Sequence, residues 1–85
     1  MDYLVVWSPK ALEDVEAIGL YISNDSPSYA GAVVKKMLDS TQILAHFPFA
    51  GRIVPELGDE SIREKFVYSY RVIYRIQQQT VTVAA

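Results

Sequence analysis

Residues 62–77 read IREKFVYSYRVIYRIQ, and this stretch decides the fold. On both sides of Tyr68 and Ser69, apolar and polar residues alternate with a period of two, the pattern of strands with one covered face. In the second half the residues that share one face are Tyr70, Val72, Tyr74 and Ile76, and those that share the other are Arg71, Ile73, Arg75 and Gln77. The stretch therefore predicts two strands of an antiparallel sheet.

Two further β-rich runs lie at the ends of the chain. Residues 80–84 follow a turn at Gln78 and Gln79, and residues 3–7 form a short run of aromatic and β-branched residues. Between residues 48 and 61, Pro48, Gly51 and Pro55 interrupt any regular period. We expect an irregular connection there and strands at both ends.

Two helix start signals occupy the first half of the chain. Ser8-Pro9 and Ser26-Pro27 each offer a capping hydroxyl followed by a proline at the first helical position. Apolar residues then recur at spacings of three and four, so each helix should bury one stripe. We predict helices over residues 9–24 and 27–46, joined by a turn short enough to make them an antiparallel hairpin.

These elements predict an α+β fold: an N-terminal strand and an antiparallel sheet of three to four strands, with the helical hairpin packed on one face. The predicted core is Leu12, Val15, Ile18, Ile22, Val34, Met37, Leu38, Leu44, Val72 and Tyr74. In residues 62–68 the more apolar set, Ile62, Glu64, Phe66 and Tyr68, is placed beneath the helices. The opposite face should then gather Arg63, Lys65, Arg71 and Arg75.

The composition bounds the class of protein. A chain of 85 residues is expected to form one domain over residues 1–85. A formal net charge of −2 argues against a strong nonspecific nucleic-acid binder. The chain has no cysteine, no apolar run long enough to span a membrane and no basic stretch ahead of an apolar core at its start. We therefore expect a cytoplasmic protein.

Few familiar catalytic arrangements can be built from these residues. Cysteine and a Gly-rich phosphate loop are missing, and His46 is the single histidine, so neither a metal site nor a cofactor is predicted. The arginines could bind phosphate groups, or they could be the charged side of a half-exposed sheet, which is the commoner case. Glu56 could act as a general base or could pair with Arg52 or another arginine, and pairing is favoured.

Read in order, the whole chain resembles the ParE/RelE family of toxins. The residues that carry the resemblance are Trp7-Ser8-Pro9 with Ala11 and Asp14, Ile18, Tyr21-Ile22, Pro27 with Ala30, Phe47-Pro48, Gly51-Arg52, Pro55-Glu56-Leu57, Arg63-Glu64 and residues 70–75. The resemblance implies the toxin of a type II toxin–antitoxin (plasmid or genome stabilisation) module. It also implies a hetero-oligomer with a cognate antitoxin protein as its partner.

The family resemblance implies two activities. ParE-like members poison DNA gyrase, and RelE-like members cut mRNA on the ribosome without a metal. For an RNase, the resemblance implies a base at Glu56 and phosphate-binding arginines at Arg63 and Arg71. The general acid of the RNases often lies in the final strand or a tail. Residues 77–85 offer no His or Tyr to serve as that acid, which favours the ParE-like activity. The sequence ends at Ala85, where relatives usually continue, so we expect a missing tail.

The expected function is therefore a ParE-like inhibitor of gyrase that an antitoxin neutralises. The target-binding residues are expected to be Arg52, Arg63, Lys65, Arg71 and Arg75. A RelE-like mRNA endoribonuclease is the alternative reading, with ribosome and mRNA as its partners. A family member that is inactive and works only as a binding partner is the second alternative.

Overall fold

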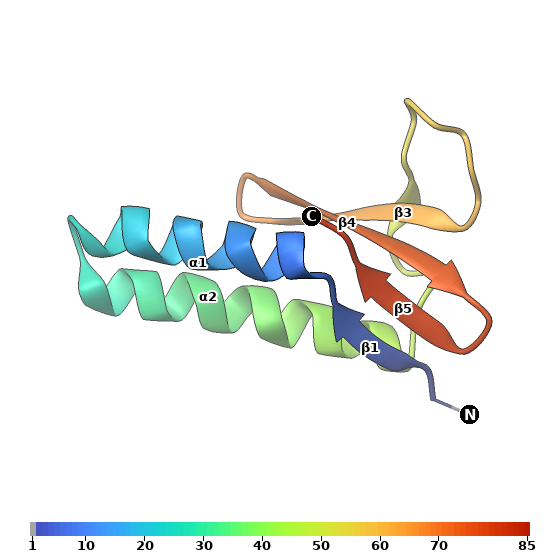
Figure 1. Cartoon of the computed structure of the whole chain (residues 1–85), viewed down its shortest axis with the longest axis horizontal. Coiled ribbons are helices and arrows are strands. Elements are labelled where there is room, and N and C mark those ends of the chain that lie inside the picture. Colours follow the sequence, from blue (N-terminus) through green and yellow to red (C-terminus); the bar gives the residue numbers. More distant parts are fainter. Residues whose placement is uncertain (1) are drawn as a thin grey trace.

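The computed structural model describes residues 2–85 as a helical hairpin packed on a five-stranded sheet (Figure 1). The elements are β1 (Leu4–Trp7), α1 (Pro9–Ser23), α2 (Pro27–Gln42), the 3-10 turn η1 (Ile43–Ala45), β2 (Arg52–Ile53), β3 (Ile62–Val67), β4 (Tyr70–Gln77) and β5 (Thr80–Val83). The predicted α+β class and the helical hairpin are confirmed.

Both helices begin where the sequence signals place them. The Ser8 hydroxyl accepts the N–H of Ala11 at 3.1 Å, and the Ser26 hydroxyl accepts the N–H of Tyr29 at 3.3 Å. Each cap is followed by a proline, which gives up an N–H that would have no helical partner. The short link at Asn24 and Asp25 makes the two helices antiparallel, and the end of the hairpin extends beyond the sheet (Figure 1).

The strand order is β1-β5-β4-β3-β2. Strands β2 to β5 pair antiparallel, but β1 pairs parallel with β5, so the prediction of an antiparallel sheet is wrong for β1. A parallel pair needs a long connection, and here everything from α1 to β4 supplies it. With the parallel β1 and the two-residue β2 included, the sheet has five strands, one more than the upper expectation of four.

The core lies between the hairpin and one sheet face. Its most buried side chains include Ala11, Val33, Met37, Leu44, Val72, Tyr74, Val81 and Val83. Two predicted core residues are wrong, because Leu12 is 51% exposed and Leu38 is 42% exposed. Each lies one position beyond the buried stripe of its helix. The preceding residues, Ala11 and Met37, are the ones that face the sheet. None of the described helices is long and apolar enough to cross a membrane.

The face assignment is confirmed for β4 and wrong for β3. A turn of two residues, with Tyr68 at a positive φ of 55°, pairs Val67 with Tyr70, Lys65 with Val72 and Arg63 with Tyr74. Cross-strand partners share a face, so Arg63 and Lys65 lie on the helix side of the sheet. Glu64 and Phe66 lie on the opposite side with Arg71, because a shift of one residue inverts every side chain of a strand.

Candidate functional site

The sheet face opposite the helices, called the open face below, carries a buried carboxylate. Glu64 is only 1% exposed, although no helix covers this side. Its two oxygens are taken by two guanidinium groups: Nε of Arg52 donates to Oε2, and Nη1 of Arg71 donates to Oε1 at 3.1 Å. Burying a charge costs free energy unless the charge is paired. The ion pairs with these two arginines offset that cost for Glu64.

Arg71 also binds a second carboxylate. Its Nη1 donates to Oε2 of Glu56 at 2.8 Å, so one guanidinium bridges the β3 residue Glu64 and a residue of the connection between β2 and β3. The hydrogen bond from Arg71 holds the pKa of Glu56 below its ordinary value of 4.5. The same hydrogen bond, with the charge of Glu56, raises the pKa of Arg71. Both groups are therefore ionised at neutral pH.

The connection over residues 54–61 is fastened to the sheet by this bridge and by its backbone. Val54 N–H donates to the carbonyl of Ile62 at 3.2 Å, and Gly58 N–H returns to the carbonyl of Val54 at 3.0 Å. Gly58 has a φ of 65°, which a residue without Cβ adopts at little cost. The loop, which contains Glu56 in its sequence, projects from the sheet in Figure 1.

Arg63 and Lys65 lie on the other side of the sheet and have their own partners. Arg63 donates to the carbonyls of Glu60 and Gly51 at 2.9 and 3.1 Å, and its guanidinium lies 5.1 Å from the ring centre of Phe49. Lys65 donates to the carbonyl of Ser40 near the end of α2 at 3.1 Å. Burial, together with the charge of Lys36, lowers the pKa of Lys65.

Tyr74 and Gly51 hold the turn after η1 to the sheet. The buried Tyr74 hydroxyl accepts the N–H of Gly51 at 2.9 Å and donates to the carbonyl of Pro48 at 2.8 Å. Burial raises the pKa of Tyr74, so the hydroxyl keeps its proton at neutral pH. A Cβ on Gly51 would lie 2.5 Å from the carbonyl oxygen of Glu64, so glycine is the residue that fits. The turn after η1 is thereby fixed against β3 and β4.

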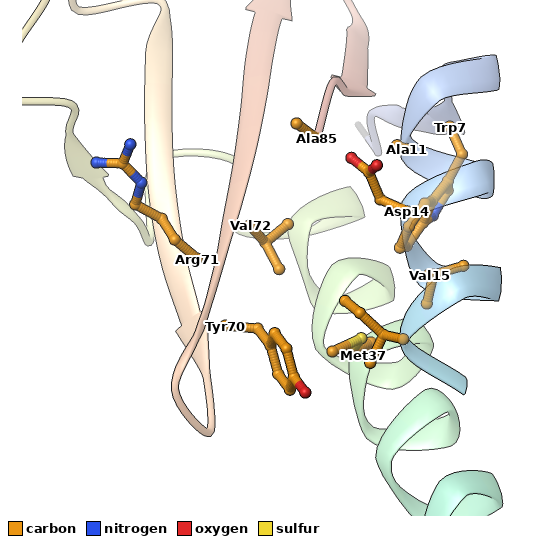
Figure 2. Close-up of a pocket in the computed structure, with 10 residues that line it drawn as sticks. Trp7, Ala11, Asp14, Val15, Met37, Tyr70, Arg71, Val72 and Ala85 are labelled. Carbon is orange, nitrogen blue, oxygen red and sulfur yellow. The ribbon is translucent and has the colours of Figure 1, made fainter. Parts of the chain in front are cut away.

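Two hollows flank β4. On the open face, Leu57, Ile62 and Ile73 surround a depression that Arg75 and Thr82 also border. On the helix side, an apolar groove between α1 and β4 is lined by Trp7, Val15, Met37, Tyr70 and Val72, among others (Figure 2). Among residues 2–85, no three His, Cys, Asp or Glu side chains are grouped so that they could hold a metal ion.

Comparison with known proteins decides the family. The family model described as the ParE toxin of type II toxin–antitoxin system, parDE, matches residues 5–85. The chain belongs to this family. A solved structure described as the chromosomal ParDE TA system from P. aeruginosa is similar to it, with a TM-score of 0.76 and 18% sequence identity over 96% of this chain and 90% of that chain. That likeness supports the fold. No curated protein matches the sequence.

In this ParE-family chain the predicted site residues divide into two groups. Glu56, Arg52 and Arg71 meet at one ion-pair network on the open face, and the favoured pairing of Glu56 with an arginine is what the geometry shows. Arg63 and Lys65 are separated from that network by the sheet, and Arg75 lies on the open face toward β5. The expected cluster of four cations is therefore wrong, and the functional roles of these residues stay predictions.

Sequence reasoning missed Glu64 as the centre of this ParE-family network. The signal was in the turn: if two residues connect β3 to β4, then Val67 must share the face of Tyr70. Counting back from Val67 places Glu64 beside Arg71 instead of beneath the helices. Ile62 and Phe66 are apolar and share a face with Glu64. For that reason the sequence alone favoured placing all three beneath the helices.

Proposed function

We propose that this protein is the toxin of a type II toxin–antitoxin module, that it inhibits DNA gyrase in the cytoplasm, and that a cognate antitoxin neutralises it. The family supports the toxin class. The similar structure is described as a ParDE system, which supports an antitoxin partner for this chain as well. Gyrase as the target follows from the ParE-like character of the family match and from the site argument below.

One observation carries the choice between inhibition and cleavage. Cleavage of RNA by attack of a 2′-hydroxyl needs a free base, an acid and cations held in one place. Here the candidate base Glu56 is bound to Arg71, and Arg71 is also bound to Glu64. The third candidate, Arg63, lies on the far side of the sheet. Because the carboxylates and guanidinium groups of this network pair with one another, the network is suited to keeping the surface rigid.

The target-contacting surface in this proposal is the open face. Arg52 and Arg75 expose their guanidinium groups there, and Phe66 lies beneath Arg52 with its ring centre 6.0 Å from that group. Arginine with an aromatic neighbour is a frequent combination at protein interfaces. Glu64 and Arg71 would hold these groups in position. Arg63 and Lys65 contribute only indirectly, through the turn at Gly51 and the end of α2.

The proposal is tested by two assays on the whole gene product. We expect inhibition of gyrase supercoiling and no codon-dependent mRNA cleavage on programmed ribosomes. Glu56→Ala should leave gyrase inhibition in place, with Glu60→Ala in the same loop as the matched control, because a base has no role in inhibition. Arg75→Glu should weaken inhibition by about tenfold, since it reverses an exposed charge on the proposed surface.

The RNase alternative rests on the contact of Glu56 with Arg71 and on the charge of Arg52 near it, which helps to lower the pKa of Glu56. Cleavage that Glu56→Ala and Arg71→Ala both abolish, with gyrase unaffected, would establish that alternative and overturn ours. A chain that binds its antitoxin but inhibits neither target would establish the inactive reading. Co-expression with the antitoxin should restore growth to cells that produce the toxin, and failure to do so would remove the antitoxin from the proposal.

A further inference from the structure

The turn that follows η1 presents two phenylalanines to solvent. Phe47 is 64% exposed and Phe49 is 55% exposed, whereas Pro48 between them is buried. Together with His46 and Ala50, these three residues line an open hollow on the surface. A single exposed apolar side chain is ordinary, whereas exposed apolar side chains that border one hollow are typical of an interaction surface.

Buried hydrogen bonds hold this turn in one conformation. The Tyr74 hydroxyl donates to the carbonyl of Pro48 at 2.8 Å and accepts the N–H of Gly51 at 2.9 Å. The turn also closes on itself, because the N–H of Ala50 donates to the carbonyl of Phe47 at 3.1 Å. Since the backbone around the two exposed rings is already fixed, a partner that binds them has little conformational entropy to remove. The turn is therefore a preorganised surface.

Arg63 gives this surface a positive charge. Its guanidinium group lies 5.1 Å from the ring centre of Phe49. The acceptors that it reaches are backbone carbonyls, those of Glu60 and Gly51. Among residues 2–85, no carboxylate forms an ion pair with Arg63, in contrast to the two arginines that hold Glu64. The positive charge beside Phe49 is therefore uncompensated within the described chain.

The acidic group nearest to the turn along its other side is already occupied. The ring nitrogen Nδ1 of His46 lies 2.9 Å from Oδ1 of Asp2. An acidic group that enters the hollow from outside would therefore find Arg63 as its counter-charge. A segment that carries a carboxylate beside an apolar side chain matches both features of the surface, because the carboxylate pairs with the guanidinium and the apolar group contacts the two rings.

The turn adjoins the open face, where target contact is proposed. β2 is an edge strand of the sheet and begins at Arg52, directly after Gly51. On the open face, the guanidinium of Arg52 lies 6.0 Å from the ring centre of Phe66. A partner that covers this edge of the sheet would contact Arg52 and Phe66 on one side and the exposed rings of the turn on the other. This continuity favours the target protein as the occupant.

We propose that the turn over residues 46–51 is a second contact surface for the target protein, and that it takes a segment in which a carboxylate stands beside an apolar side chain. The apolar side chain lies between Phe47 and Phe49, and the carboxylate binds Arg63. The inference rests on the proposed function, in which the target is gyrase. Toward the open face Arg63 acts only through the turn, whereas at the turn itself it binds the target directly.

The first test measures the affinity of the whole chain for purified gyrase. Phe47→Ala and Phe49→Ala should each weaken binding about tenfold or more, because each removes an aromatic ring from the contact. Leu20→Ala is the matched control and should bind as the wild type does, since Leu20 is also 64% exposed but lies on α1. Circular dichroism checks that the three variants are folded. Wild-type affinity in both phenylalanine variants, or an equal loss in the control, would overturn the inference.

A second measurement isolates the carboxylate. Salt screens ion pairs, so the affinity of the wild type for gyrase should fall as ionic strength rises. Arg63→Gln keeps a side-chain donor but removes the charge, and it should bind about fivefold or more weakly at low salt and depend less on salt. Arg63→Lys should retain most of the salt dependence. Lys35→Gln, on an exposed part of α2, makes the same change in net charge and is the control.

The outcome for Arg63→Gln decides whether a carboxylate belongs to the occupant. If this variant keeps the affinity and the salt dependence of the wild type, the proposed pairing with Arg63 is wrong. If Lys35→Gln loses as much affinity as Arg63→Gln, the effect belongs to net charge and the pairing is wrong as well.

Two other occupants of the turn are distinguished by the same variants. Affinity for the antitoxin should not change in Phe47→Ala and Phe49→Ala, and a loss as large as that for gyrase would assign the turn to the antitoxin and refute the inference. A wild-type dimer in sedimentation that Phe49→Ala dissociates would assign it to a second copy and refute it too. A wild type that does not inhibit gyrase refutes the proposed function, whereas full inhibition by both phenylalanine variants refutes only this inference.

Discussion

The two faces of the sheet bury side chains by different means. Toward the helices, Tyr74 is fully buried among apolar side chains, with two hydrogen bonds for its hydroxyl. Toward the open face, Glu64 is equally buried, but it is held by the guanidinium groups of Arg52 and Arg71. On the helix side, apolar side chains pack together and exclude water. On the open face, two ion pairs compensate the charge of the buried carboxylate. The comparison teaches that a buried position on this sheet does not need a helix above it.

The helix side should show the larger effect on stability. Leu44 is 0% exposed, so Leu44→Ala should lower the free energy of unfolding by about 2–5 kcal/mol, because it removes apolar contacts and leaves a cavity. Leu38→Ala is the matched control and should cost about 1 kcal/mol or less, since Leu38 is substantially exposed. Urea unfolding measures both. Equal losses would contradict the burial that separates the two leucines.

Tyr74→Phe tests a buried hydroxyl on the helix side of the sheet. It should lower the free energy of unfolding by about 1–3 kcal/mol, because the buried N–H of Gly51 and the carbonyl of Pro48 both lose their partner. Tyr70→Phe is the control, because its ring also faces the helices but lies less buried. If Tyr74→Phe proves neutral, the hydroxyl is not what fixes the turn after η1.

Glu64→Gln tests the open face. We expect a loss of about 1–2 kcal/mol, smaller than for a fully buried ion pair, because Arg52 and Arg71 are partly exposed and can be solvated by water. Glu60→Gln, on the exposed loop, is the control and should be neutral. A loss as large as that of Leu44→Ala would mean that the charge network, and not the apolar layer, dominates this domain.

The smallest expected effect is that of Glu56→Gln, and it should depend on pH. Because Arg71 holds the pKa of Glu56 below 4.5, the stabilisation by ionised Glu56 is complete above 4.5 and is lost as pH falls through the lowered value. The urea midpoints of the wild type and the variant should therefore converge in acid. In an Arg71→Gln background the substitution should show no such pH dependence. A difference that persists in acid would assign the effect to packing.

Much of the fold followed from local signals. Ser8-Pro9 and Ser26-Pro27 placed both helices because capping and proline geometry are local properties. The alternation of residues 70–77 gave both faces of β4 because apolar and charged residues are cleanly separated there. Leu12 and Leu38 were misplaced because a helical stripe read from one sequence is uncertain by about one position.

The candidate site was predicted less well from the sequence than the fold, because it depends on which residues of neighbouring strands pair. The face of β3 was predicted wrongly because Ile62 and Phe66 are apolar and share a face with Glu64. No local pattern predicts that Glu64 is buried on the open face, since a carboxylate is buried only when partners from elsewhere reach it. Arg52 and Arg71 arrive from β2 and β4, and Glu56 from the loop between β2 and β3. The parallel placement of β1 was missed for the same reason, since its partner lies at the other end of the chain.

The parallel pairing of β1 with β5 also sets an order of events during synthesis. The Ser8 hydroxyl donates to the carbonyl of Ala84, 76 residues away, so this contact waits until Ala84 has left the ribosome. The helical hairpin closes over a short sequence distance and can form early, whereas the pairing of β1 with β5 forms later. The sheet therefore stays incomplete through much of translation, until β5 is available to pair with β1.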